Sequence, residues 1–148
     1  MENKSNHDNI LRHIRYLNKL INADFDNRLS ECGLTSQQGR ILFFVYCKTN
    51  NAGEIVHQND IENEFHLSKS TVSGLVKRME KKEFIKIEKQ HPYAVVKPTD
   101  KGEEIITHLR KKRESAIERI LAGIDKKDRE CFLKTLNKMI SNLEGGEK

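Results

Sequence analysis

Apolar residues recur at steps of three and four along most of the chain, which predicts a mostly helical protein. Over residues 7–30 this spacing predicts one long amphipathic helix, and Gly33 is suited to end it. A second helix is predicted to open at Thr35, whose hydroxyl can form a capping box with Gln38, and to run through the apolar residues 41–47.

The next part of the chain predicts two short helices joined by a tight turn. Residues 48–53 are rich in turn formers and separate this part from the helix before it. The first short helix is predicted over residues 58–65, and Ser68 is suited to cap the second, which runs to about Lys82. The second helix carries one apolar stripe at the spacing i, i+3, i+4 and i+7, formed by Val72, Leu75, Val76 and Met79.

After this helix the spacing of apolar residues changes from helical to alternating. Ile85 and Ile87 alternate with charged residues, and residues 94–96 favour a strand. These two strands are predicted to form a hairpin with its tip at residues 89–93. Two helices in tandem followed by a basic hairpin are the pattern of a winged helix-turn-helix.

The helical spacing then returns to the end of the chain. Thr99 is suited to cap a long helix, residues 123–125 interrupt it, and a last helix is predicted to end at Gly145. The predicted fold class is mainly α: a winged helix-turn-helix with a two-stranded wing, flanked by N- and C-terminal dimerisation helices. Only 36% of the 148 residues are hydrophobic, which favours a chain that buries further surface by dimerising.

The net charge of +5 is concentrated in one segment. Residues 66–101 carry nine Lys or Arg against four Asp or Glu, so they account for the whole net charge. Such a concentration is typical of a surface that binds a polyanion, although a solvated basic face without a partner has the same appearance.

The second short helix has the residue types that a DNA-reading helix needs. Its apolar stripe can pack on the domain while small hydroxyl and basic side chains enter a major groove about 12 Å wide. A glycine inside a helix costs about 1 kcal/mol relative to alanine, so at Gly74 we expect close approach to DNA or to a neighbouring helix, with a tolerated surface glycine as the alternative. The DNA-contacting residues predicted here are Ser68, Lys69, Ser70, Thr71, Ser73, Gly74, Lys77 and Arg78.

Three pieces of sequence resemble the MarR family of bacterial regulators. Residues 67–82 look like its recognition helix, Leu34-Thr35-Ser36-Gln37-Gln38 like the opening of its second helix, and Thr99-Asp100-Lys101-Gly102 like the Thr-x-x-Gly after its wing. Their order and spacing match the family over about residues 10–145.

The resemblance implies a homodimer that binds a pseudo-palindromic operator in double-stranded DNA and represses transcription until an effector releases it. It implies a dimerisation region over residues 1–32 and 103–148 and a DNA-binding domain over residues 33–102. The family's effector pocket lies between these regions, where the plausible lining residues are His13, Tyr16, Phe43 and Tyr46.

Two departures from the family pattern concern the end of the recognition helix and the wing. Glu83 stands where the family has a glycine, so the helix is expected to end differently. The wing lacks the family's Asp-x-Arg, whose arginine enters the minor groove; Lys89, His91 or Lys97 would take over those contacts. A winged-helix protein that binds DNA without sequence preference, or binds another protein, therefore stays an alternative.

Other chemistry has weaker support in the sequence. No phosphate loop, HExxH motif or nucleophile elbow is present, so we predict neither an enzyme nor a cofactor. No two His are spaced for a helical metal site, which leaves a constellation of Glu31, Cys32 and His108 as the metal alternative. Cys47 and Cys131 are expected to be packed, with Cys32 the exposed candidate for a redox switch. No apolar run is long enough for a membrane helix, and we expect a cytoplasmic protein.

Overall fold

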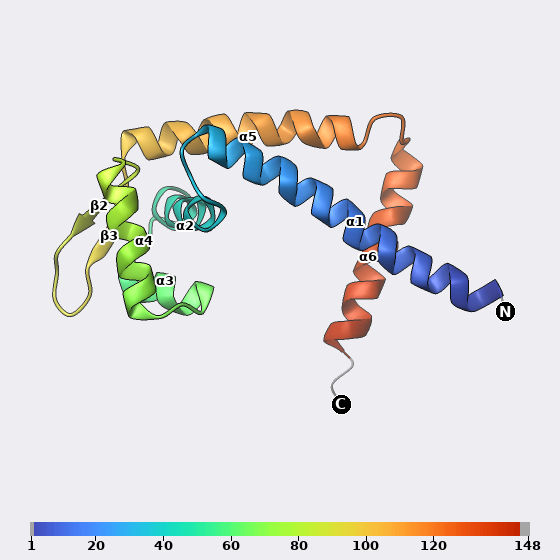
Figure 1. Cartoon of the computed structure of the whole chain (residues 1–148), viewed down its shortest axis with the longest axis horizontal. Coiled ribbons are helices and arrows are strands. Elements are labelled where there is room, and N and C mark those ends of the chain that lie inside the picture. Colours follow the sequence, from blue (N-terminus) through green and yellow to red (C-terminus); the bar gives the residue numbers. More distant parts are fainter. Residues whose placement is uncertain (1, 146–148) are drawn as a thin grey trace. The chain divides into compact units, whose positions relative to one another are not determined.

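The computed structural model describes the backbone of residues 2–145 and the side chains of residues 7–145. Within these residues the chain is mainly helical (Figure 1). The helices are α1 (Glu2–Glu31), α2 (Ser36–Tyr46), η1 (a π-helix, Cys47–Asn51), α3 (Gln58–Phe65), α4 (Lys69–Lys81), α5 (Asp100–Ile120) and α6 (Lys126–Glu144). The strands are β1 (Val56–His57), β2 (Ile85–Glu88) and β3 (Val95–Pro98).

The first two helices end and begin where the sequence predicted. Gly33 adopts a positive φ of 77° after α1, and the backbone N–H of Leu34 returns to the carbonyl of Leu29. Thr35 and Gln38 form the predicted capping box of α2, since each side chain accepts the other's backbone N–H. At its other end α1 begins at Glu2, five residues earlier than predicted. After α2 the chain stays helical as the π-helix η1, where a turn was expected.

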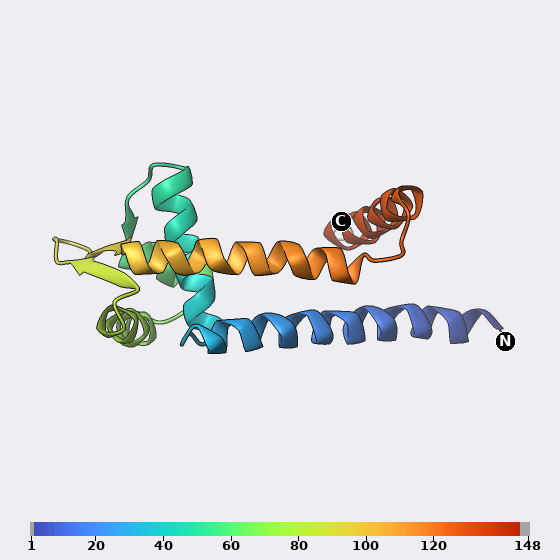
Figure 2. The ribbon, with the colours of Figure 1, turned by 90° about the horizontal axis from the view of Figure 1, so that it is seen from above.

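The hydrophobic core surrounds α2. Its fully buried side chains Ile41, Leu42 and Val45 pack with the buried faces of α4 and the sheet. Leu29, at the C-terminal end of α1, is also fully buried in this cluster. The rest of α1 runs away from the winged region (Figure 2).

The helix-turn-helix is formed by α3 and α4. His66 takes a left-handed backbone conformation with φ 51°, which lets the chain reverse within three residues. Ser68 caps α4 as predicted, and its hydroxyl accepts the backbone N–H of Thr71 at 3.2 Å. Burial of Ile61 in α3 fixes the first helix on the core.

The wing belongs to a three-stranded antiparallel sheet in the order β1-β3-β2, so the prediction of two strands was incomplete. Strands β2 and β3 form the predicted hairpin, with Ile87 opposite Val96. On the other side of β3, Val56 of β1 pairs with the same Val96. A strand of two residues is too short to show an alternating pattern, so no sequence pattern indicates β1.

The expectation that Glu83 would end α4 differently from a glycine was wrong. Glu83 adopts a positive φ of 66°, the conformation that a glycine usually supplies at this place. The backbone N–H of Phe84 reaches the carbonyl of Met79 at 3.1 Å, and the N–H of Glu83 reaches that of Glu80 at 2.8 Å. The Thr99 hydroxyl donates to the Glu83 carbonyl and so holds this turn from the start of α5.

Gly102 is required by the close approach of α5 to the end of α4. A Cβ at this position would lie 2.2 Å from the backbone oxygen of Phe84. The Thr99 hydroxyl also accepts the backbone N–H of Gly102 at 3.1 Å, as predicted for an N-cap. The Thr-x-x-Gly sequence therefore joins the wing to α5 through one capping bond and one position without a side chain.

The chain divides into two compact units, the first ending at Lys112 and the second beginning at Arg113. In the second unit Gly123 has a positive φ of 76°, and Asp125 caps α6 by accepting the N–H of Asp128. None of the described residues of α6 is buried. No helix within residues 2–145 is long and apolar enough to span a membrane.

Candidate nucleic-acid interface

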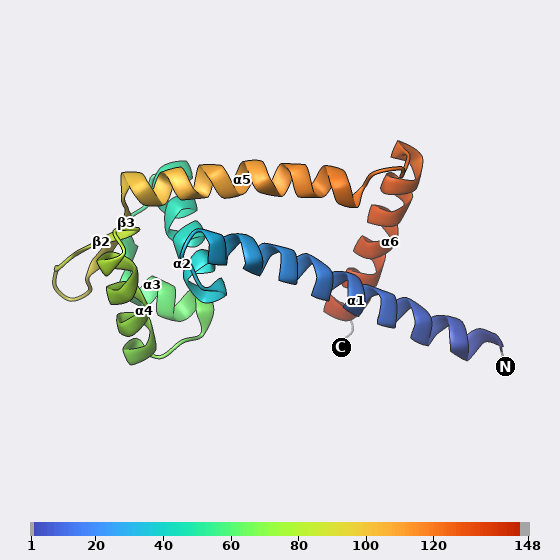
Figure 3. The ribbon, with the colours of Figure 1, turned by 45° about the horizontal axis from the view of Figure 1, so that its top comes forward.

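Helix α4 has one packed face and one open face. Val72, Val76 and Met79 are fully buried and Leu75 is 9% exposed, so the apolar stripe forms the contact with the core as predicted. Each such side chain stabilises the fold by about 2 kcal/mol. Ser70, Gly74, Lys77 and Lys81 follow one another at i, i+4, i+7 and i+11, and therefore share the side that faces away from the core. Figure 3 shows α4 beside the wing at the edge of the winged region.

The N-terminal end of α4 carries a cluster of three exposed hydroxyls. The Ser68 hydroxyl lies 2.8 Å from that of Thr71 and 3.2 Å from that of Ser70. Because Ser68 also caps the helix, its hydroxyl has a structural role as well as an exposed position. The backbone N–H groups at a helix N-terminus attract phosphate, so hydroxyls here are suited to bind the DNA backbone or base edges.

The predicted cations of α4 are exposed and available. Lys69, Lys77 and Arg78 make no ion pair within the described residues. A Cβ on Gly74 would meet only the Arg78 guanidinium, at 3.5 Å, so no neighbouring helix accounts for this glycine. Contact with a neighbouring helix therefore does not explain Gly74, and close approach to DNA stays a prediction beside a tolerated surface glycine.

The predicted wing residues differ in their surroundings. Lys89 and His91 lie exposed at the hairpin tip, where they can reach a DNA backbone. Lys97 lies on β3 and forms an ion pair with Glu88 at 3.2 Å. Its charge is thereby partly compensated, so Lys97 is the weaker of the three candidates for a phosphate contact.

Three contacts that the sequence did not reveal hold α4 in place. Lys82 donates to the Gly33 carbonyl at 2.7 Å, and Lys101 donates to the Lys82 carbonyl at 3.0 Å. The Glu80 carboxylate accepts the backbone N–H of Ile87 at 2.7 Å. Each contact links separate elements, so no local sequence pattern indicates it.

Two of the four predicted effector residues, Phe43 and Tyr46, lie on α2, and the other two, His13 and Tyr16, lie on α1. The guanidinium of Arg110 lies 5.8 Å from the ring centroid of Phe43 and 5.1 Å from that of Tyr46, so these two aromatics share a cation. On α1, Tyr16 is 60% exposed and the His13 ring lies 2.7 Å from the backbone oxygen of Asn9 on its own helix. Arg110 is the residue of this region that sequence reasoning missed.

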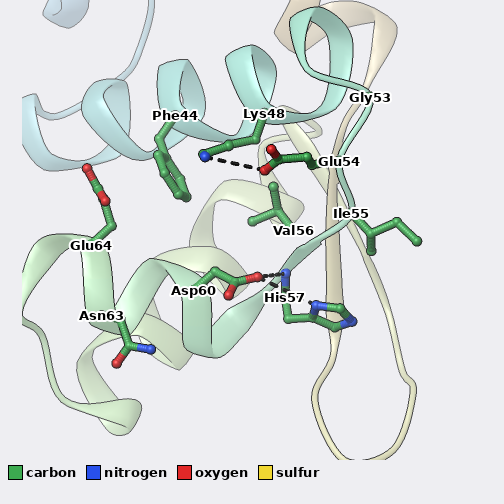
Figure 4. A pocket seen from close by; sticks show the side chains of 10 residues that line it. All are labelled: Phe44, Lys48, Gly53, Glu54, Ile55, Val56, His57, Asp60, Asn63 and Glu64. Atoms are coloured by element: carbon green, nitrogen blue, oxygen red, sulfur yellow. Dashed lines mark hydrogen bonds and ion pairs between the residues drawn. The ribbon is translucent and has the colours of Figure 1, made fainter.

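A cavity of about 820 Å³ lies within the winged region, between the α2–η1 segment and α3 (Figure 4). Its wall combines apolar Phe44 and Val56 with an ion pair of Lys48 and Glu54 at 3.3 Å. None of the four predicted effector residues lines it.

The cysteines differ from expectation. Cys131 is exposed rather than packed, as are most residues of α6 within one chain. Cys32 is half-buried rather than exposed. Burial, and secondarily the Glu31 carboxylate, raises the pKa of the Cys32 thiol, which disfavours the reactive thiolate. Within the described residues, Glu31, Cys32 and His108 do not form a group that could hold a metal ion.

Solved structures of several bacterial regulators share this fold. A MarR family protein from Bacillus stearothermophilus is 18% identical, with a TM-score of 0.76 over 95% of this chain and 97% of the other. A transcriptional regulator from Thermotoga maritima is 24% identical, with a TM-score of 0.68 over 95% and 98%. MepR of Staphylococcus aureus, in complex with DNA, is 21% identical, with a TM-score of 0.63 over 88% and 93%. No curated protein matches the chain by sequence.

A helix that exposes hydroxyl and basic side chains beside a β-wing is the arrangement found in winged-helix DNA-binding domains. The MarR family model matches residues 33–91, which include α2, α3, α4 and the first strand of the wing. The match covers this part of the chain, and the fold of the chain is that of MarR-family winged-helix regulators. The family model thus agrees with the resemblance seen in the sequence.

Proposed function

We propose that the protein is a cytoplasmic homodimer that binds a pseudo-palindromic operator and represses transcription until a small-molecule effector releases it. The observation that carries this proposal is the geometry of α4. Its apolar stripe is buried, while Ser70, Lys77 and Arg78 are exposed, and the two cations make no ion pair within the described residues. A helix arranged in this way can enter a major groove without disturbing the core.

Exposed apolar side chains support the dimer. Among residues 7–145, thirteen of the sixteen exposed large hydrophobic residues lie on α1 or between Ile117 and Leu143. Leu143 is 83% exposed and Leu133 is 59% exposed, whereas monomeric proteins rarely leave so many apolar side chains in contact with water. We infer that residues 1–32 and 103–148 pair two chains, and that residues 33–102 bind the DNA.

Charge and comparison support DNA as the ligand. The whole net charge of +5 falls within residues 66–101, which contain α4 and the wing. MepR, which shares the fold, has been solved as a DNA complex. The proposed contacts of α4 are Ser68, Lys69, Ser70, Thr71, Ser73, Gly74, Lys77 and Arg78, and those of the wing are Lys89, His91 and Lys97.

The effector is proposed to bind near α2. Phe43 is 42% exposed, and with Tyr46 and Arg110 it forms an aromatic and cationic surface within the first unit. Tyr16 and His13 of α1 are proposed to complete the site. An effector that binds in this region would act on α2, which packs against both α4 and β3.

A salt titration separates this function from DNA binding without sequence preference. The protein is titrated with its own upstream promoter DNA and with the same DNA scrambled, from about 50 to 300 mM salt. The proposal predicts a preference of about 10³-fold or more at physiological salt, with two protomers per site. Equal and steeply salt-dependent binding to the promoter DNA and the scrambled DNA would favour DNA binding without sequence preference.

A further inference from the structure

We propose that Glu80 is a positioning residue that fixes the wing beside the recognition helix, and that it thereby contributes to sequence preference. The inference rests on the proposed function, because it assigns to Glu80 a part in the same DNA site. Glu80 is not among the predicted DNA contacts, and its charge is opposite to that of its surroundings.

The first observation is a hydrogen bond between two elements. Glu80 lies in the last turn of α4, and its Oε2 accepts the backbone N–H of Ile87 in β2 at 2.7 Å. Strand β2 is at the edge of the sheet, since the order is β1-β3-β2. A carboxylate is a strong acceptor for a backbone N–H, so the bond ties the wing directly to α4.

The second observation is the position of this bond along the hairpin. Ile87 is half-buried and comes one residue before the end of β2, after which residues 89–93 are all exposed. The ion pair between Lys97 and Glu88 joins β2 to β3 but does not hold either strand to α4. Among the described residues, the Glu80 bond is thus the side-chain bond that holds the tip-side end of the hairpin to the recognition helix.

The third observation is electrostatic. Glu80 belongs to the segment that holds the whole positive charge, on the helix that carries Lys77, Arg78 and Lys81. A carboxylate here repels DNA phosphates, so it weakens binding to any DNA sequence. The hydrogen bond from Glu80 to Ile87, if it improves the fit of the wing to one DNA sequence, strengthens binding to that sequence. The repulsion by the charge and the effect of the hydrogen bond can be measured separately.

The experiment compares three variants of the full chain. Glu80→Ala removes the acceptor and the charge, Glu80→Gln keeps an oxygen acceptor, and Glu83→Gln removes a nearby charge without touching the bond. Amide hydrogen exchange of Ile87 is measured first in the free protein. We expect exchange at least about tenfold faster in Glu80→Ala, and within about threefold of the native rate in the other two. Unchanged exchange in Glu80→Ala would overturn the tether.

DNA binding is then measured with the duplex that the native chain enriches from randomised DNA, and with a scrambled duplex. All three variants should bind scrambled DNA about twofold to threefold more tightly, because each has lost a negative charge. Only Glu80→Ala should lose sequence preference, measured as the affinity for the enriched duplex divided by the affinity for the scrambled duplex. We expect this ratio to be at least about fivefold lower in Glu80→Ala than in Glu83→Gln. An equal ratio in these two variants would overturn the role in sequence preference. If no duplex is enriched, the proposed function fails, while Ile87 exchange still decides the tether.

Discussion

The winged region and the terminal helices bury their apolar residues to very different degrees. In the winged region Ile41, Leu42 and Val96 are fully buried within one chain. On α1, Leu11 and Leu20 are each 50% exposed, and on α6 no described residue is buried. The winged region thus has a core of its own, while most apolar side chains of α1 and α6 are not buried within their own unit.

This difference separates two kinds of sequence pattern that look alike. The apolar residues of α1 and α4 both recur at helical spacing, yet those of α4 are buried within the chain, whereas most of those of α1 are exposed. The spacing predicts that an apolar helix face will be buried, but it does not indicate whether the face packs against the same chain or against a second chain. The comparison can be tested at both regions.

The largest effect is expected on dimerisation. Deleting residues 1–22 should abolish the dimer, because it removes the exposed apolar face of α1 but keeps Leu29 in the core. Analytical ultracentrifugation of the truncated chain measures the result, and a stable dimer would contradict the assignment. As a point variant, Leu17→Lys should raise the dimer dissociation constant about 100-fold. Asn18→Lys, one residue along the helix, is its control.

The next largest effect concerns two glycines that lie within helices. Gly102→Ala should lower the free energy of unfolding by about 3 kcal/mol, since its Cβ would lie 2.2 Å from the Phe84 carbonyl oxygen. Gly74→Ala should instead raise it by about 1 kcal/mol, because only the flexible Arg78 side chain is near. Urea unfolding compares the two, and equal effects would refute the close approach at Gly102.

Arg78→Ala should weaken binding to the operator by about 1 to 2 kcal/mol while the fold stays intact. Arg78 is exposed and makes no ion pair within the described residues, so its loss disturbs no internal contact. Fluorescence anisotropy at physiological salt measures the change, with thermal unfolding as the check on stability. Unchanged affinity would remove Arg78 from the DNA contacts.

The smallest effect is expected at the end of α4. Glu83→Gly should stabilise the protein by about 1 kcal/mol or less, because glycine adopts the positive φ of 66° without strain. The same urea measurement applies, and loss of stability would indicate that the Glu83 side chain has a role of its own.

What the sequence predicted correctly was mostly local. The caps at Thr35 and Ser68 bind within three residues, and the stripe of α4 lies within two turns, so neighbouring positions suffice to indicate them. Glu83 was misjudged because the usual preference for glycine was taken as a requirement. The bond from Thr99 to its carbonyl shows how a distant residue supports the conformation.

What the sequence missed depends on residues far apart in the chain. Strand β1 has two residues and pairs with β3, about 40 residues later. Arg110 reaches Phe43 and Tyr46 from α5, and Glu80 reaches Ile87 across the turn after α4. Such contacts follow from the packing of whole elements rather than from spacing. Which of the predicted residues touch DNA stays a prediction.

Selection from randomised double-stranded DNA by the full chain tests the central claim most directly. A dimer that reads sequence with two copies of α4 should enrich an inverted repeat whose half-sites lie about one helical turn, or 10 base pairs, apart. Enrichment of a single unrepeated half-site would contradict the paired arrangement of the two chains. Failure to enrich any sequence would contradict sequence reading by α4 and leave only the basic surface as the basis for DNA binding.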